Sequence, residues 1–416
     1  MSSSEFPLSR ALLHPSAVFI ARLSGPVLGE ARWLSARRLC AYSAIMIAAS
    51  VAMILFAMSG HGLEDPSGRP IGTDFVSFWT VSSALLEGRQ ALVYIPQALY
   101  ALEKTLAGGK DIPFYAWQYP PIALLLVYPL ALLPYLYALA LWLGAGIAGY
   151  LSLLWRILPR RETLKAGLAF PAVLLTVLHG QNAFLTASLL GWGLLFLRRR
   201  PAFAGVLFGV LAFKPQLGVL LPVALLAGKH WRAFGAAAAT VAGLAAASAI
   251  LFGPAIWREF LAGAPFAGAI LDDGLVPYYK MQSVFAAVRL EGGPLFLAYS
   301  VQALVALAVA AFLIRAWRLR ADPDLQNAAL LAAIPLATPF CLDYDLMVIA
   351  PAILWLAKKG LEGRALPFER TALAAAAMAP LFSPALGAST GVLLAPVVMA
   401  ALFAVIMRRL FLEARA

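Results

Sequence analysis

Asp74 is the first polar side chain in this sequence whose type and setting could do chemistry. It lies in a short polar stretch that directly precedes an apolar run at 75–87. An aspartate in this position is a good helix N-cap, and a carboxylate held at a membrane surface can also act as a general base. The two roles are compatible, so Asp74 is a candidate catalytic residue with helix capping as the alternative interpretation.

Lys214 is a candidate phosphate-binding residue because it lies between two short apolar runs, 201–213 and 215–228. An ionisable side chain at membrane depth is costly unless it faces water or a partner, and it often marks a functional site. Its ammonium group could hold an anionic phosphate as a point charge; the alternative is a lysine that snorkels to the membrane surface. Three amide side chains are expected at similar depth, where they could bind hydroxyl groups or cap helix ends: Gln181, Asn182 and Gln216.

Two carboxylates, Asp343 and Asp345, flank a tyrosine in a turn that follows an apolar run. This spacing suits the binding of sugar hydroxyls, the binding of a metal ion or helix capping. A hard cation would require more oxygen ligands than the sequence assures. We therefore predict no metal site and no cofactor.

The loop 271–283 combines acidic residues and two tyrosines with Lys280 and Gln282. Aromatic rings beside polar groups suit a carbohydrate or headgroup pocket, and the alternative is an aromatic belt at the membrane interface. Tyr119, which precedes two prolines, marks a chain reversal or simply a helix start. His179 by itself is as consistent with a structural histidine as with a ligand-binding one.

These residues are embedded in a chain of 416 residues that is 62% hydrophobic and only 12% charged. A mean hydropathy of +0.84 excludes an ordinary soluble domain, which is about 25% charged, and it excludes disorder. The net charge of +12 comes from short clusters of Lys and Arg between apolar runs rather than from a continuous basic face, so nucleic-acid binding is not expected. We predict an all-α polytopic membrane protein with about 11–13 transmembrane helices.

The basic clusters also predict the orientation, because short cytoplasmic loops carry an excess of Lys and Arg. Residues 1–36 are expected to form a cytoplasmic segment without a cleaved signal peptide, and 37–416 a single transmembrane domain. The first transmembrane helix is predicted at roughly 39–59. Residues 60–118 then form the first extracytoplasmic loop, with an interfacial amphipathic helix at 75–87 and a second short helix at about 96–107.

Two further features concern membrane depth. Residues 119–155 are long enough for two helices, and we expect a re-entrant or interfacial piece at 119–133 followed by one true span. Runs of 13–15 residues are about 20–22 Å long, shorter than the hydrocarbon layer of about 30 Å. The turns at 179–182 and 214–216 should therefore lie below the outer surface and line a hydrated cavity.

The order and spacing of several short motifs resemble glycosyltransferase family 87, the DUF2029-type polyprenol-phosphate-mannose-dependent mannosyltransferases of the GT-C superfamily. The matching motifs lie between about 70 and 360: Asp74, 86–88, 93–94, Tyr119-Pro120-Pro121, Gly180-Gln181-Asn182, 204–209 with Lys214-Pro215, Met281-Gln282-Ser283, Thr338-Pro339 and Asp343-Tyr344-Asp345. The resemblance implies a GT-C helical bundle with an outward-facing active site. It also implies Asp74 as the catalytic acidic residue and Lys214 at a position suited to the donor phosphate. Some relatives carry histidine around the Asp-Tyr-Asp turn, and this chain does not.

The resemblance thus implies a membrane hexosyltransferase. It would move a sugar, mannose by resemblance, from a polyprenyl-phosphate donor to a hydroxyl of a lipid or glycan acceptor, with inversion, at the extracytoplasmic face of a bacterial inner membrane. Membrane lipids would be its other partners. A secondary transporter or lipid flippase is the alternative, although such proteins usually place polar groups near the bilayer midplane within repeats, and no repeat stands out. A noncatalytic scaffold is a third possibility that leaves a lysine at membrane depth unexplained.

Overall fold

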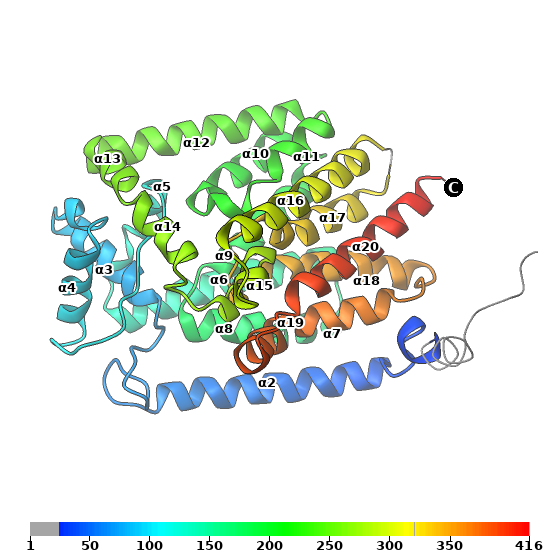
Figure 1. Cartoon of the computed structure of the whole chain (residues 1–416), viewed down its shortest axis with the longest axis horizontal. Helices are drawn as coiled ribbons and strands as arrows, with labels where there is room; N and C mark the ends of the chain where they lie inside the picture. Colours follow the sequence, from blue (N-terminus) through cyan, green and yellow to red (C-terminus); the bar gives the residue numbers. More distant parts are fainter. Residues whose placement is uncertain (1–24, 320, 416) are drawn as a thin grey trace, which may run out of the picture.

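The computed structural model describes residues 25–319 and 321–415, and this part of the chain is entirely helical apart from its loops. Long helices run side by side, with α2 along one edge and α12 along the opposite edge (Figure 1). Six described helices are long and apolar enough to cross a membrane: α2 Ala36–Met58, α6 Tyr135–Ile157, α12 Trp231–Phe252, α16 Leu295–Arg318, α19 Glu369–Thr390 and α20 Ala395–Glu413. A π-helical turn at Gly25–Gly29 precedes α2, and the rest of the predicted cytoplasmic segment, residues 1–24, lies outside the described residues.

The other apolar runs form shorter helices, which is why this number is below the predicted 11–13. Pro171 interrupts one run, so that α7 Arg161–Leu168 and α8 Pro171–His179 meet at a bend of 53° and together could form a seventh span. The remaining short helices are α9 Ala183–Phe196, α10 Pro201–Val210, α11 Leu221–Ala227, α17 Pro323–Ala337 and α18 Ile349–Glu362.

The peripheral helices expose apolar side chains, which identifies lipid as their surroundings. Only 6% of the most apolar window of α2, and of that of α12, is buried within the protein. Exposed leucines, isoleucines and phenylalanines in water would be costly over such lengths, whereas lipid accepts them. The protein is therefore an integral membrane protein.

The first loop carries α3 Phe75–Leu86, the 3-10 turn η2 Gln90–Leu92 and α4 Pro96–Leu106 at one end of the molecule (Figure 1). Both helices lie close to where the sequence predicts them. The structure adds that α3 is largely enclosed by protein, because nine of its twelve residues are buried. One of its buried polar side chains, Ser82, donates its hydroxyl to the carbonyl of Tyr128 at 2.7 Å.

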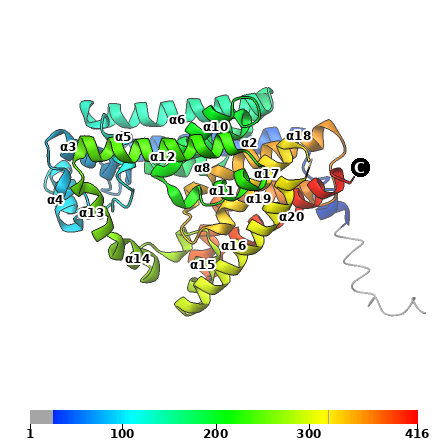
Figure 2. The same cartoon turned by 90° about the horizontal axis from the view of Figure 1, so that it is seen from above.

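The segment after this loop follows the sequence expectation of a short piece and one long helix. Helix α5 Ile122–Val127 and the 3-10 turn η3 Leu130–Leu132 come first, and Pro134 then precedes the 23-residue α6. The region 253–293 is also helical, with α13 Ala255–Ala262, α14 Ala264–Asp272, η6 Tyr278–Lys280 and α15 Val284–Leu290. These elements connect α12 to α16; α13 lies at the end of the molecule that carries α3 and α4, and α14 and α15 lead away from that end (Figure 2).

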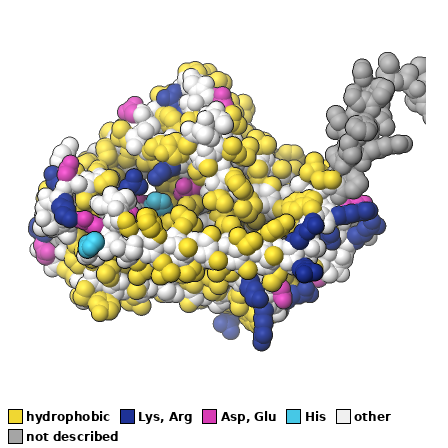
Figure 3. All heavy atoms as spheres, turned by 90° about the horizontal axis from the view of Figure 1, so that it is seen from below, with side chains coloured by type: hydrophobic (Ala, Val, Ile, Leu, Met, Phe, Trp, Pro, Cys, Tyr) yellow, Lys and Arg dark blue, Asp and Glu magenta, His cyan; other side chains and the backbone are white. Residues whose placement is uncertain are grey.

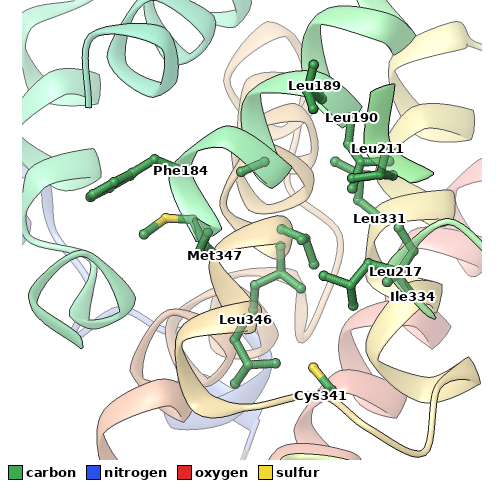
Figure 4. Close-up of a cluster of buried hydrophobic side chains, with 14 of the residues drawn as sticks. Phe184, Leu189, Leu190, Leu211, Leu217, Leu331, Ile334, Cys341, Leu346 and Met347 are labelled. Carbon is green, nitrogen blue, oxygen red and sulfur yellow. The ribbon is translucent and has the colours of Figure 1, made fainter. Parts of the chain in front are cut away.

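A buried apolar cluster joins the elements that carry the polar candidates. Its side chains come from α9, α17 and three 3-10 turns, η4 Leu211–Phe213, η5 Pro215–Leu217 and η7 Asp343–Val348 (Figure 4). Leu217, Ile334 and Leu346 are fully buried in this cluster. Because protein interiors are closely packed, the cluster holds Lys214 and Asp345 in fixed positions relative to each other.

Candidate active site

Gly180 brings the turn after α8 against the start of α3. It ends α8 in the left-handed conformation, with φ of +60°, which favours glycine. A Cβ at this position would lie 2.6 Å from the Cβ of Phe75 and 2.9 Å from the carbonyl oxygen of Gly72. Only a residue without a side chain permits this approach, which places Gln181 beside Asp74.

Asp74 is half-buried at the N-terminus of α3, where it occupies the N-cap position. Its side chain makes no capping hydrogen bond. Instead, its Oδ2 accepts a hydrogen bond of 2.9 Å from Nε2 of Gln181. The geometry thus gives no support to the capping interpretation and leaves the carboxylate able to accept a proton.

Gln181 and Asn182 extend this contact to Tyr119. The Tyr119 hydroxyl donates to Oε1 of Gln181 at 3.3 Å and accepts from Nδ2 of Asn182 at 2.9 Å. The Tyr119 carbonyl accepts from the hydroxyl of Tyr94 at 2.9 Å, which fixes this segment to the first loop, residues 60–118. The tyrosine and the two amides therefore act together in one network.

Lys214 completes the network from the opposite side. Its Nζ donates to Oδ1 of Asn182 at 3.1 Å and to Oδ1 of Asp345 at 2.5 Å. Lys214 lies between η4 and η5 directly before Pro215, a position where the backbone is biased away from the α-helical conformation. The side chains of Lys214 and Asp345 are 3% and 0% exposed, so each charge depends on the other for compensation.

A second group of polar side chains surrounds Asp343. Met281 and Leu342 form an isolated antiparallel bridge, and the backbone N–H of Gln282 donates to the carbonyl of Cys341 at 2.6 Å. This pairing sets Lys280 opposite Asp343, where their charges interact. The Asp343 carboxylate, which is 7% exposed, accepts a hydrogen bond of 2.8 Å from the backbone N–H of Tyr344.

His179 also belongs to the site, although its place in the sequence is only a weak reason to expect it there. It is half-buried, and its Nδ1 shares a hydrogen bond of 2.7 Å with the hydroxyl of Thr73, the neighbour of Asp74. Its ring lies 6.0 Å from that of Tyr344, and it is near Asp343. The sequence feature that could have identified His179 was its position directly before Gly180 and the two amides.

Glu103 is a second residue that sequence reasoning missed, because it resembles a surface charge on the amphipathic α4. Its side chain is fully buried, and its Oε2 accepts a hydrogen bond of 3.0 Å from the backbone N–H of Tyr115. Burial raises the pKa of Glu103 to about 8, and the charge of Asp74 adds to the rise. The two carboxyl groups are therefore near enough to influence each other.

Besides Lys280 and Asp343, two further predicted site residues stand apart from the network. Gln282 is buried, and its Nε2 donates to the carbonyl of Tyr279 at 2.9 Å, which supports the loop rather than reaching Asp74. Gln216 is half-buried, and its side chain forms no hydrogen bond with any other described residue. Of the predicted residues, the hydrogen-bonded network thus unites Asp74, Tyr119, Gln181, Asn182, Lys214 and Asp345.

A narrow crevice lies beside the network, next to Asn182. The crevice, lined by Tyr119, Asn182 and apolar side chains, has a volume of about 10 Å³, which is room for about one water molecule. Figure 3 shows basic, acidic and histidine side chains together at a hollow in an otherwise apolar face. Polar groups are thus reachable from outside the protein.

Fold and site together define a polytopic membrane protein with a polar, partly buried site at one end of its helices. The family model for Glycosyltransferase family 87 matches residues 117–339, more than half of the chain, and the protein belongs to that family. It is therefore a glycosyltransferase, which uses a sugar donor and an acceptor. Comparison with curated proteins and with solved structures gave no match.

Proposed function

We propose that this glycosyltransferase moves mannose from a polyprenyl phosphate to a hydroxyl group of a lipid or glycan acceptor, within a GT-C-type helical bundle. The observation that carries the proposal is the continuous chain of hydrogen bonds from Asp74 to Lys214. It links a half-buried carboxylate that makes no capping bond to a buried cation. A base and a positive charge in one site match the needs of a displacement at a phosphorylated sugar.

The side of the membrane is inferred from charge. Lys and Arg side chains gather toward the end of the molecule opposite α3 and α4 (Figure 3). Cytoplasmic loops are enriched in such residues. We therefore assign the end with Asp74 to the extracytoplasmic face of a bacterial inner membrane.

In the proposed reaction Asp74 accepts the proton of the acceptor hydroxyl. The hydroxyl oxygen forms a bond to the anomeric carbon while the bond from that carbon to the phosphate oxygen breaks. Polyprenyl phosphate leaves with the bonding electrons, and a single displacement inverts the anomeric configuration. Gln181 orients the carboxylate, and positioning of both substrates supplies a further large share of the rate.

The leaving phosphate requires positive charge, and the site offers two lysines for it. Lys214 has two of its three N–H donors engaged and is 3% exposed, so it has little room for direct contact. Lys280 is half-buried and more accessible, opposite Asp343. We propose that Lys280 contacts the phosphate directly and that Lys214 stabilises it through its remaining N–H and its charge.

Membership of a glycosyltransferase family favours sugar transfer over the transporter or flippase alternative. The test is to incubate the purified protein in proteoliposomes with a panel of polyprenyl-phosphate sugars that includes mannose and arabinose. The proposal predicts loss of the mannosyl donor and release of polyprenyl phosphate. A transporter would leave every donor chemically intact, and consumption of the arabinosyl donor alone would reassign the sugar.

A further inference from the structure

A second pocket lies outside the hydrogen-bonded network, between the first extracytoplasmic loop and the α13–α14 region. Its volume is about 150 Å³. Figure 2 shows α4 and α13 at the same end of the molecule. Five aromatic side chains and one amide line it: Tyr94, Phe114, Trp117, Phe260, Phe266 and Gln118.

Aromatic rings from the first loop and from α13 and α14 line this pocket together. The ring of Tyr94 lies 5.6 Å from that of Phe260, and the ring of Phe114 lies 6.3 Å from that of Phe266. Each pair joins the first loop to α13 or α14. The other lining residues from the α13–α14 region are small: Gly263, Ala264 and Ala267.

The size of the pocket limits what it can hold. An engineered protein cavity of similar volume, about 150 Å³, takes up one benzene molecule, so this pocket suits one six-membered ring. A polyprenyl chain is far larger. None of the lining residues belongs to the six long apolar helices, which argues against a site for a lipid tail within the hydrocarbon layer.

The lining also indicates the chemistry of the ring. Ligand pockets are mostly apolar, with a few polar groups that fix orientation. The apolar C–H face of a pyranose can pack on aromatic rings while its hydroxyl groups face an amide or water. Gln118 supplies such an amide, and its side chain makes no hydrogen bond within the described part of the chain.

One chain segment connects this pocket to the network. Phe114, Trp117 and Gln118 line the pocket, whereas Tyr119 belongs to the network. The rings of Trp117 and Tyr119 are 5.0 Å apart. A ring bound in the pocket would therefore lie next to the site that contains Asp74.

We infer that the aromatic pocket binds one sugar ring of the acceptor and so positions the next hydroxyl group for transfer. This inference rests on the proposed function, since it assigns the acceptor to a subsite of the same reaction. It also makes the acceptor a glycosylated molecule rather than a bare lipid. Phe266 and Gln118 would be specificity-determining residues.

The pocket can be blocked without disturbing the core. Ala267 is exposed at its mouth, and Ala262 is an equally exposed alanine on α13 that does not line it. We would compare Ala267→Phe with the control Ala262→Phe in the full-length protein in nanodiscs. Saturation-transfer NMR would follow the binding of methyl α-mannopyranoside and methyl β-glucopyranoside, with decanol as an apolar competitor.

The inference predicts that a pyranoside binds to the wild type and to Ala262→Phe through its ring protons. In Ala267→Phe its affinity should fall about tenfold, a change of about 1.4 kcal/mol. Equal binding in all three proteins, or displacement of every pyranoside by decanol, would overturn it. Gln118→Ala provides a second test in the same assay, and unaltered pyranoside binding there would contradict the role of the amide.

Measuring consumption of the donor distinguishes failure of this inference from failure of the proposed function. Consumption of a polyprenyl-phosphate sugar by wild type and Ala267→Phe alike, with a raised KM for acceptor only in the variant, supports both. Consumption with no effect of Ala267→Phe on acceptor KM overturns the pocket and leaves the proposed function standing. Loss of pyranoside binding in Ala267→Phe without consumption of any donor contradicts the proposed function but supports sugar binding in the pocket.

Discussion

The ammonium of Lys214 and the carboxylate of Asp345 meet at 2.5 Å, although the two residues are 131 positions apart in the chain. Neither side chain is more than 3% exposed. A second hydrogen bond joins the lysine to Asn182, whose own amide nitrogen donates to Tyr119. The ion pair therefore anchors the network that ends at Asp74.

Breaking this pair from one side should destabilise the protein strongly. Lys214→Met leaves Asp345 buried without its cationic partner, and loss of one member of a buried ion pair costs about 3–5 kcal/mol. The double variant Lys214→Met/Asp345→Asn removes both charges and should recover most of that loss. Unfolding in detergent, followed by temperature and by denaturant, measures both changes.

The pair between Lys358 and Asp324 provides the matched control. It has a similar length, 2.7 Å, but its side chains are 29% and 21% exposed. Lys358→Met should therefore cost less than Lys214→Met, at about 1 kcal/mol or below. Equal losses in the two single variants would contradict the special role assigned to burial of Lys214.

Gly180→Ala should separate the turn after α8 from the start of α3. The added Cβ would lie 2.6 Å from that of Phe75, and alanine also disfavours the φ of +60°. We expect a loss of stability of about 1–3 kcal/mol together with lower transfer activity. Gly243→Ala in α12, where a Cβ meets no atom within 4 Å, is the control and should leave activity unchanged. Wild-type activity in Gly180→Ala would show that this close approach is dispensable.

Because Glu103 is buried, we predict that the stability of the folded protein depends on pH. Burial raises its pKa to about 8 from an ordinary value of 4.5, so the folded protein keeps a proton that the unfolded chain loses first. Stability should therefore fall as pH rises from about 4.5 to about 8 and change little through this group above that range. Glu103→Gln keeps an acceptor for the N–H of Tyr115 but cannot ionise, so its melting temperature should fall less between pH 6 and 9. A parallel fall in both proteins would exclude Glu103 as the source.

Gln181 is predicted to act through Asp74 rather than on the substrates alone. Gln181→Ala removes the 2.9 Å hydrogen bond to the carboxylate. A hydrogen bond to a charged group is worth about 1.5–3 kcal/mol, so kcat should fall by roughly tenfold to a hundredfold. KM for the donor should change much less. A change in KM alone, with an unaltered kcat, would assign Gln181 to substrate binding.

The sequence predicted the helical class and most helix positions because apolar runs and prolines act locally. It placed α5 and α6 correctly, and it identified Asp74, Gln181, Asn182 and Lys214 as polar residues among apolar neighbours. Burial of α3 was missed because that burial depends on packing by distant segments. A local pattern likewise contains no information on which partner a charge will meet.

The contacts within the site were also not predicted, because they join segments that are far apart in the sequence. Asp345 was predicted to bind substrate, and its pairing with Lys214, a contact across 131 residues, was not predicted. The bridge between Met281 and Leu342 sets Lys280 opposite Asp343. No local sequence pattern predicts so short a pairing between two segments. His179 and Glu103 became informative only once Thr73 and Tyr115 were found beside them.

The most direct test of the central claim is transfer by Asp74→Asn in proteoliposomes. Asparagine keeps the size of the side chain and an oxygen for Gln181, and no capping bond is lost, so folding should be preserved. Removal of a general base typically costs about 10²–10⁴ in rate, and we predict a fall of kcat in that range. The exposed Asp273→Asn, in the loop after α14, is the control and should transfer sugar as the wild type does. Turnover by Asp74→Asn close to that of Asp273→Asn would contradict Asp74 as the base.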